Sequence, residues 1–238
     1  MELTAAHHAR IDAVNPVLNA VIAEAREGSR TAARAADQRR ASGAALPPLH
    51  GVPMTHKDTH DAAGLPTVKG SPLFADTVPT TSSLIIDRLQ AVGVISTGKT
   101  NVPELAAGSH TFNTVFGTTV NPWDITRSAS GSSGGVAAVI AAGIQPAGDG
   151  SDMGGSLRTP ASFTNTVGFR SSSAVADRAP DAALRSAGVL GPVLGAVAGR
   201  RPGRILHRPG WTPERRAGGP GGGGRHRDGL HRPRRDRR

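Results

Sequence analysis

Two glycine-rich loops contain the serines best suited to covalent chemistry. Ser132 and Ser133 lie within residues 131–135, and Ser156 ends residues 148–156. Glycines let several backbone N–H groups converge on one point, which makes a site for an anion or an oxyanion. One such loop alone would more often be a linker. Two loops that both border apolar segments favour acyl transfer, in which a serine attacks where the negative charge develops.

A serine hydroxyl becomes a good nucleophile only when a base removes its proton. His56 and His60 flank Asp58, so a Ser/His/Asp arrangement is one alternative. Lys57 is another, because it follows an apolar segment, 51–55, that predicts a buried strand, and burial lowers the pKa of a lysine. A Lys57–Asp58 ion pair at a strand end is the purely structural interpretation. The residue types alone leave all three open.

Residues 93–100 match the phosphate-binding pattern G-x-x-x-x-G-K-[ST]. A phosphate-binding loop of this kind has a strand before its first glycine and a helix that begins at its lysine. Here an amphipathic helix is predicted before Gly93, and the apolar pair that follows predicts a strand. Pro103 disfavours a helix directly after the pattern. We therefore interpret the segment as a turn at a strand end rather than a nucleotide site.

The elements that must position these residues are predicted to alternate between helix and strand. The first forty residues predict two helices, with a turn at Asn15-Pro16 and the second helix over 23–40. Later helices are predicted at 84–92 and 136–142. Strands are predicted at 51–55, 94–97 and 144–147. This alternation indicates an α/β architecture.

Composition and charge exclude several classes of protein. The sequence contains no cysteine, which excludes disulfides, thiolate metal sites and a cysteine nucleophile. It has neither an apolar run of the roughly 18–20 residues that span a membrane nor a signal-peptide pattern, so we expect a cytoplasmic protein. The net charge of +10 resides entirely in residues 200–238, because residues 1–199 hold 15 basic and 15 acidic side chains.

Residues 200–238 consist mainly of arginine, glycine, proline and histidine, with almost no core-forming side chain. Such a segment cannot offset its ordering entropy by burial, so we expect it to be disordered. Its arginines would attract phosphate groups weakly and in a salt-dependent way, without base readout.

Four blocks of sequence resemble, in the same order, the amidase signature family, whose members hydrolyse carboxamides through a Ser–cis-Ser–Lys triad. The blocks are residues 49–58, 97–104, 131–135 and 148–161, and the resemblance spans about residues 11–170. It implies an α/β fold with a mixed β-sheet flanked by helices, incomplete in this chain. We expect a partial amidase signature domain over 1–195 and a disordered tail over 196–238.

The resemblance also implies roles for individual residues. Lys57 matches the catalytic lysine, Ser132 the bridging serine that follows a cis peptide bond, and Ser156 the nucleophile. The oxyanion hole is matched by the backbone N–H groups of Met153, Gly154, Gly155 and Ser156. Ser133 belongs to the same substrate-binding loops, which it supports together with Asp152 and Arg158.

The implied reaction is hydrolysis of a carboxamide C–N bond, through an acyl-serine, to a carboxylate and ammonia or an amine. It needs no metal and no organic cofactor. Within the family, the alternative is the subunit that releases ammonia from glutamine for transfer-RNA-linked amidation. A non-catalytic fragment with weak nucleic-acid affinity is the third interpretation. Expected partners are a small-molecule amide and, in a homo-oligomer, further copies of the chain, with no membrane and no specific nucleic acid.

The resemblance weakens toward the C-terminus. Residues 171–173 depart from the family's usual proline-serine-glycine continuation, residues 177–192 resemble it again, and nothing after Pro192 does. Family sequences are also considerably longer. We therefore expect a truncated chain with a shifted reading frame near its end and with little amidase activity of its own.

Overall fold

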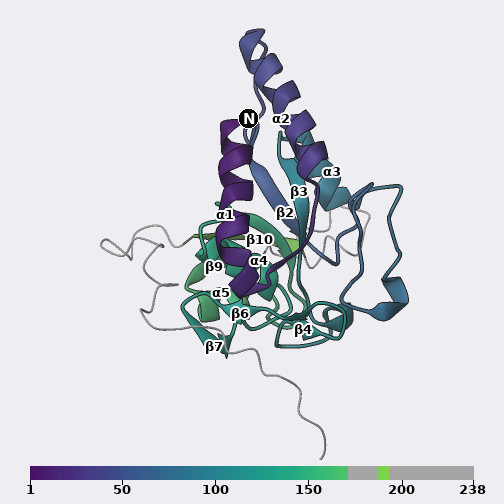
Figure 1. Cartoon of the computed structure of the whole chain (residues 1–238), viewed down its shortest axis with the longest axis vertical. Helices are drawn as coiled ribbons and strands as arrows, with labels where there is room; N and C mark the ends of the chain where they lie inside the picture. The colour runs from purple at the N-terminus through teal and green to yellow at the C-terminus, as the bar shows by residue number, and fades with distance from the viewer. Residues whose placement is uncertain (171–186, 193–238) are drawn as a thin grey trace, which may run out of the picture. The chain divides into compact units, whose positions relative to one another are not determined.

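The computed structural model describes residues 1–170 and 187–192 (Figure 1). The α-helices are α1 (Glu2–Leu18), α2 (Arg26–Ala41), α3 (Leu84–Ala91), α4 (Gly134–Ala141) and α5 (Arg158–Thr164), with short 3₁₀ helices at Pro72–Phe74 and Glu104–Ala106. The strands are β1 (Val21–Glu24), β2 (Pro53–Lys57), β3 (Ile95–Thr100), β4 (Phe112–Asn113), β5 (Gly117–Thr118), β6 (Val120–Asn121), β7 (Asp124–Ser128), β8 (Gly148–Ser151), β9 (Thr166–Arg170) and β10 (Ala187–Pro192).

Two three-stranded sheets organise the described residues. One has the order β1-β3-β2, in which β3 pairs in parallel with β2 and antiparallel with β1. The other has the order β8-β10-β9 and is antiparallel. The first is the mixed sheet that the resemblance implies, and its parallel register places Lys57 opposite Thr100. The carboxyl ends of β2 and β3 therefore lie together.

Helix α4 is buried because almost every residue in it is apolar or glycine. A helix that is apolar all round belongs in a core rather than at a surface. Val136 and Val139 are fully buried, and they belong to the same apolar cluster as Ile11 and Leu18 of α1. This packing fixes the start of α4, and the serine loop at 131–133 directly precedes it.

The predicted turn at Asn15-Pro16 is wrong, because α1 continues through Pro16 to Leu18. The helix ends instead at Asn19, whose backbone is left-handed and whose N–H donates to the Asn15 carbonyl. The Asn15 side chain also accepts hydrogen bonds from the backbone N–H groups of Ala20 and Val21, at 2.9 and 2.8 Å. Asn15 is thus part of the helix end rather than of a turn inside the helix.

The strand predicted at 144–147 is also wrong. Gly143 adopts φ +69°, and the Ile144 N–H donates to the Val139 carbonyl at 2.9 Å, so Ile144 closes helix α4. The strand begins only at Gly148, in the segment predicted to be a loop. Similarly, the first residues of the helix predicted over 23–40 end strand β1, and α2 begins at Arg26.

Other predictions fall on parts of the chain that the structure does not describe. The expected tail, 196–238, and the boundary at 195 lie outside the described residues. Among residues 1–170 and 187–192, no helix combines the length and apolar character needed to cross a membrane.

Candidate active site

Lys57 is the last residue of β2 and is completely buried. Its Nζ lies 2.8 Å from Ser132 Oγ and 2.8 Å from Ser151 Oγ. The first contact joins a strand to a loop 75 residues further along the chain. Lys57 thus extends from the carboxyl end of β2 toward two serine hydroxyls, on loop 131–133 and strand β8.

The loop that carries Ser132 is held closely against neighbouring backbone. The Gly131–Ser132 peptide bond is cis, as the resemblance implies. A Cβ on Gly131 would lie 3.0 Å from the Gly108 carbonyl oxygen, so only glycine fits without displacement. Ser132 itself is 1% exposed. The loop therefore presents the Ser132 hydroxyl to Lys57 from a tightly packed position.

Asp152 organises the loop that leads to Ser156. Its carboxylate accepts hydrogen bonds from the Gly155 N–H at 2.7 Å, from the Leu157 N–H at 3.3 Å, and from Arg158 Nε at 2.8 Å. The Arg158 guanidinium holds the pKa of this carboxyl well below its usual value. Because Gly155 donates to Asp152, its N–H is not free for an oxyanion in this structure. Gly155 has φ +119°, a conformation that favours glycine.

Ser156 is the last residue of the second serine loop. Its carbonyl accepts a hydrogen bond from the Ser133 N–H at 3.1 Å, which ties the two serine segments together. The Ser156 side chain is partly exposed, whereas Ser132 is buried. Met153 and Gly154, whose N–H groups are the other predicted oxyanion donors, are exposed. The 153–154 segment thus lies at the surface next to Ser156.

Burial changes the chemistry of Lys57. It lowers the pKa of the ammonium from 10.5 to about 7, and the charges of Asp149 and Asp152 oppose this shift. A lysine with this pKa is about half neutral at pH 7. The neutral amine has a lone pair with which to accept a serine proton. Lys57 thus has both the contacts and the ionisation of a general base.

The two histidines considered as bases form no hydrogen bond with Ser132 or Ser156. The Nδ1 atoms of His56 and His60 each lie 2.6 Å from the Asp149 carboxylate. The Lys57–Asp58 ion pair is also wrong, because Asp58 pairs with Lys99, whose Nζ lies 3.7 Å from Asp58 Oδ1. Of the three alternatives for the base, the geometry favours Lys57.

Residues 95–100 of the segment matching the phosphate-binding pattern form strand β3, and Gly93 lies in the turn before it. Strand β3 continues to Thr100, so the predicted turn at a strand end is wrong, whereas the rejection of a phosphate loop agrees with the structure. Lys99 Nζ donates to Thr67 Oγ1 at 3.0 Å and to the His60 carbonyl. This lysine is completely buried within the protein and holds the segment that follows β2.

Asp149 and Ser151 are parts of the site that sequence analysis did not identify. Both belong to β8, where side chains two residues apart lie on one face of the sheet. The Asp149 carboxylate accepts the Lys57 backbone N–H at 3.2 Å, and Ser151 accepts a hydrogen bond from Lys57 Nζ. The signal was the alternation Gly-Asp-Gly-Ser, which we predicted to be a loop.

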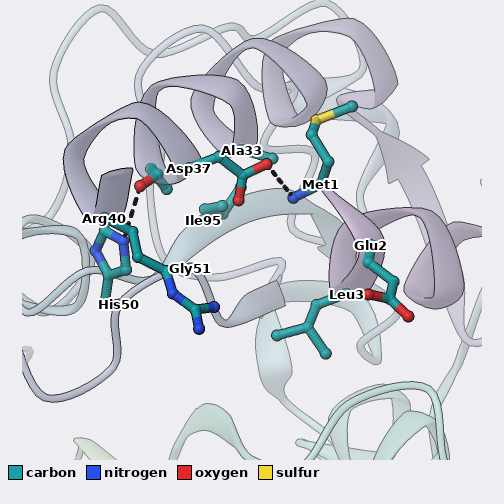
Figure 2. Close-up of a pocket in the computed structure, with 10 residues that line it drawn as sticks. Met1, Glu2, Leu3, Ala33, Asp37, Arg40, His50, Gly51 and Ile95 are labelled. Carbon is teal, nitrogen blue, oxygen red and sulfur yellow. Dashed lines mark hydrogen bonds and ion pairs between the residues drawn. The ribbon is translucent and has the colours of Figure 1, made fainter. Parts of the chain in front are cut away.

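The cavity shown in Figure 2 is separate from these residues. It has a volume of about 380 Å³ and is lined by the first residues of α1, by α2 and by Ile95. The Met1 amino group and the Asp37 carboxylate lie 2.9 Å apart at its edge. Ile95 starts β3, whereas Lys57 lies opposite Thr100 at the other end of that strand. The cavity therefore contributes nothing to the serine site.

Comparison with known proteins identifies similar chains. A family model described as Amidase matches residues 2–189. The glutamyl-tRNA(Gln) amidotransferase A chain of Acidothermus cellulolyticus is 44% identical over 71% of this chain and 34% of that protein. Its counterpart from Azoarcus sp. is 44% identical over 79% of this chain and 39% of that protein. The chain thus spans about a third of the length of the curated relatives it matches.

Solved structures show the same similarity. A bacterial aryl acylamidase of the amidase signature enzymes superimposes with a TM-score of 0.70 and 35% identity, over 72% of this chain and 36% of that one. The peptide amidase of Stenotrophomonas maltophilia gives a TM-score of 0.66 and 32% identity, over 70% and 36% of the two chains.

Proposed function

The chain belongs to the amidase family. We propose that it hydrolyses a carboxamide through an acyl-serine, with Lys57 as base, Ser132 as proton relay and Ser156 as nucleophile. The observation that carries the proposal is the 2.8 Å contact between the buried Lys57 Nζ and Ser132 Oγ. A buried lysine that meets a serine hydroxyl, with a pKa of about 7, is a base prepared for proton transfer.

The proposed reaction proceeds in two balanced stages. Neutral Lys57 takes the proton of Ser132, which takes the proton of Ser156, and Ser156 Oγ bonds to the amide carbon. The Lys57 ammonium then returns the proton through Ser132 to the leaving nitrogen as the C–N bond breaks. In the second stage, water gives a proton through Ser132 to Lys57 as its oxygen bonds to the acyl carbon. The proton then returns to Ser156 Oγ as the ester C–O bond breaks, and the carboxylic acid departs and ionises to the carboxylate.

The oxyanion formed in each stage needs hydrogen-bond donors that are already in position. The N–H groups of Met153, Gly154 and Ser156 remain for this role, since Gly155 donates to Asp152. The Asp152–Arg158 pair holds the loop from the opposite side. We propose that these three N–H groups bind the oxyanion and that Ser133 and Asp152 fix their directions.

The substrate class has two candidates. One is a small or aryl carboxamide, which the similarity to an aryl acylamidase favours. The other is glutamine, because the amidotransferase relatives are 44% identical to this chain. In that case partner subunits would receive the ammonia. Release of an aryl amine from an anilide, compared with release of ammonia from glutamine, distinguishes the two.

A serine-directed fluorophosphonate probe tests the proposal without requiring a complete substrate pocket. Attack by the activated serine displaces fluoride and leaves a stable phosphonyl-serine, which peptide mass spectrometry locates. We expect modification at Ser156 and its loss in Ser156→Ala and Lys57→Met. Ser42→Ala, which removes a serine from the exposed end of α2, is the matched control and should label normally. Modification that persists in Ser156→Ala would refute the assignment.

A further inference from the structure

Asp149 is a buried carboxylate that the proposed reaction does not use. It is 1% exposed and accepts hydrogen bonds from three groups. These are Nδ1 of His56 at 2.6 Å, Nδ1 of His60 at 2.6 Å, and the backbone N–H of Lys57 at 3.2 Å. A buried carboxylate is costly unless its oxygens are satisfied. All three of these donors come from the segment that carries Lys57.

His56 is held by hydrogen-bond partners at both of its ring nitrogens. Its Nε2 lies 2.8 Å from Ser96 Oγ, which also accepts a hydrogen bond from Gln90 Nε2 at 2.9 Å. The amide nitrogen of Gln90 can only donate, so the Ser96 hydroxyl hydrogen is available to His56 Nε2. The Asp149 carboxylate can only accept, so His56 Nδ1 carries a hydrogen and donates it to Asp149. The carboxylate therefore keeps its negative charge.

The carboxylates around Lys57 have different partners. Asp152 is paired with the Arg158 guanidinium at 2.8 Å, and Asp58 with Lys99 at 3.7 Å. Asp149 contacts imidazoles rather than a permanent cation. Burial alone would raise the pKa of Asp149, but His56 and His60 hold it well below its usual value. Asp149 is thus the carboxylate that joins the Lys57 backbone to two imidazoles.

This charge matters when Lys57 accepts a proton. A buried ammonium is unfavourable in a low-dielectric interior unless an opposite charge lies nearby. Asp149 is the first of the two carboxylates whose charge favours the Lys57 ammonium. Its hydrogen bond to the Lys57 backbone also ties the end of β2 to β8. One side chain thus affects both the position of the lysine and the energy of its charged form.

We propose that Asp149, held by His56 and His60, is a positioning residue that fixes the end of β2 and supplies the counter-charge for the Lys57 ammonium formed in each stage. The proposal rests on the amide hydrolysis proposed above. It adds a residue that transfers no proton and touches no substrate, but stabilises the protonated base, as the carboxylate of a Ser-His-Asp triad stabilises its imidazolium.

Asp149→Asn separates charge from shape, because the amide has nearly the size of the carboxylate. The full chain contains three lysines, Lys57, Lys69 and Lys99, so their side-chain nitrogen signals can be followed by NMR as the pH changes. Loss of the counter-charge should lower the midpoint of the Lys57 titration by about one pH unit. Asp149→Glu, which keeps the charge, should return the midpoint toward its original value.

Asp58→Asn is the matched control, because it also removes a buried carboxylate next to Lys57. Its charge acts on Lys99 rather than on Lys57. This variant should change the Lys99 signal and leave the Lys57 midpoint in place. Fluorophosphonate labelling of Ser156 should be about tenfold slower in Asp149→Asn at pH 8 and unchanged in Asp58→Asn. In Asp149→Asn, the pH below which the labelling rate falls should also be lower.

The outcomes separate this proposal from the proposed function. If Asp149→Asn leaves the Lys57 midpoint unchanged while the unsubstituted chain still labels at Ser156, Asp149 is only structural and the inference is refuted. If the midpoint moves but the unsubstituted chain never labels, the counter-charge is established and the proposed hydrolysis is refuted. A purely structural role would lower thermal stability without moving the midpoint.

Discussion

The pH dependence of the reaction at Ser156 follows from the ionisation of Lys57. Burial lowers the pKa of this lysine to about 7, so lowering the pH removes the neutral, proton-accepting form. The neutral fraction is about 9% at pH 6, about 50% at pH 7 and about 91% at pH 8. If Lys57 is the base, the labelling rate of Ser156 should rise about tenfold from pH 6 to pH 8 and then level off.

The assay is the initial rate of fluorophosphonate labelling across pH 5–10, with the site of modification identified by mass spectrometry. Lys57→Met keeps the length of the side chain, removes the base, and should lower the rate at pH 8 by at least about a hundredfold, since general bases contribute 10²–10⁴-fold. Lys69→Met is the matched control. Lys69 is partly exposed and pairs with Asp61 at 3.8 Å, so the same substitution there should leave the profile unchanged.

The pH at which the labelling rate levels off distinguishes a largely neutral Lys57 from an ordinary lysine or another base. A lysine with the ordinary value of 10.5 would give a rate that still rises about tenfold between pH 8 and pH 9. Such a rise would contradict a buried, neutral Lys57. A rate that is flat from pH 6 to pH 8 would show that another group is the base, and Lys57→Met would then label normally.

Two further predictions concern the loops. Asp152→Asn should slow Ser156 labelling at least about tenfold, because it removes the charge that binds Arg158 and weakens the hydrogen bond from the Gly155 N–H. An unchanged rate would mean that the loop holds its shape without this pair. Gly135→Ala should destabilise the fold by about 1–3 kcal/mol, because its Cβ would lie 2.7 Å from the Asn101 backbone nitrogen. The control Gly28→Ala, in α2 with no atom within 4 Å of the new Cβ, should stabilise it by about 0.5–1 kcal/mol. Thermal unfolding of both variants measures the difference, and equal melting temperatures would contradict the steric argument.

Elements with a strong local pattern were predictable from the sequence. Helix α4 follows from an unbroken apolar run, and strand β2 from the apolar residues before Lys57. Element ends were less predictable, because they depend on particular side-chain contacts. Asn15 closes α1 through its own amide, and Gly143 with Ile144 closes α4. These contacts shift the element boundaries by a few residues. The contact at Ile144 closes α4 where we predicted the strand at 144–147.

Only the residues within the sequence motifs could be predicted as parts of the site. The motifs placed Lys57 and the two serine loops in one site, and the structure brings Lys57 within 2.8 Å of Ser132, while their catalytic roles stay predictions. Asp149 carried no such signal. Its partner His56 is 93 residues away in sequence, and an aspartate between two glycines resembles a loop residue. Its contact with the Lys57 backbone joins strands β8 and β2 of two different sheets, so no local sequence pattern indicates it.

Asp149 and Asp152 lie three residues apart and have the same side chain, yet their partners give them different tasks. Asp152 is bound to a guanidinium and to the Gly155 N–H, so it holds a loop. Asp149 is bound to imidazoles and to the Lys57 backbone N–H, and its charge favours the Lys57 ammonium. A base at this position needs both opposing influences. Burial without Asp149 would lower the pKa of the lysine further and make it a weaker base, and Asp149 without burial would leave the lysine charged at pH 7. The pKa of about 7 is the balance of the two.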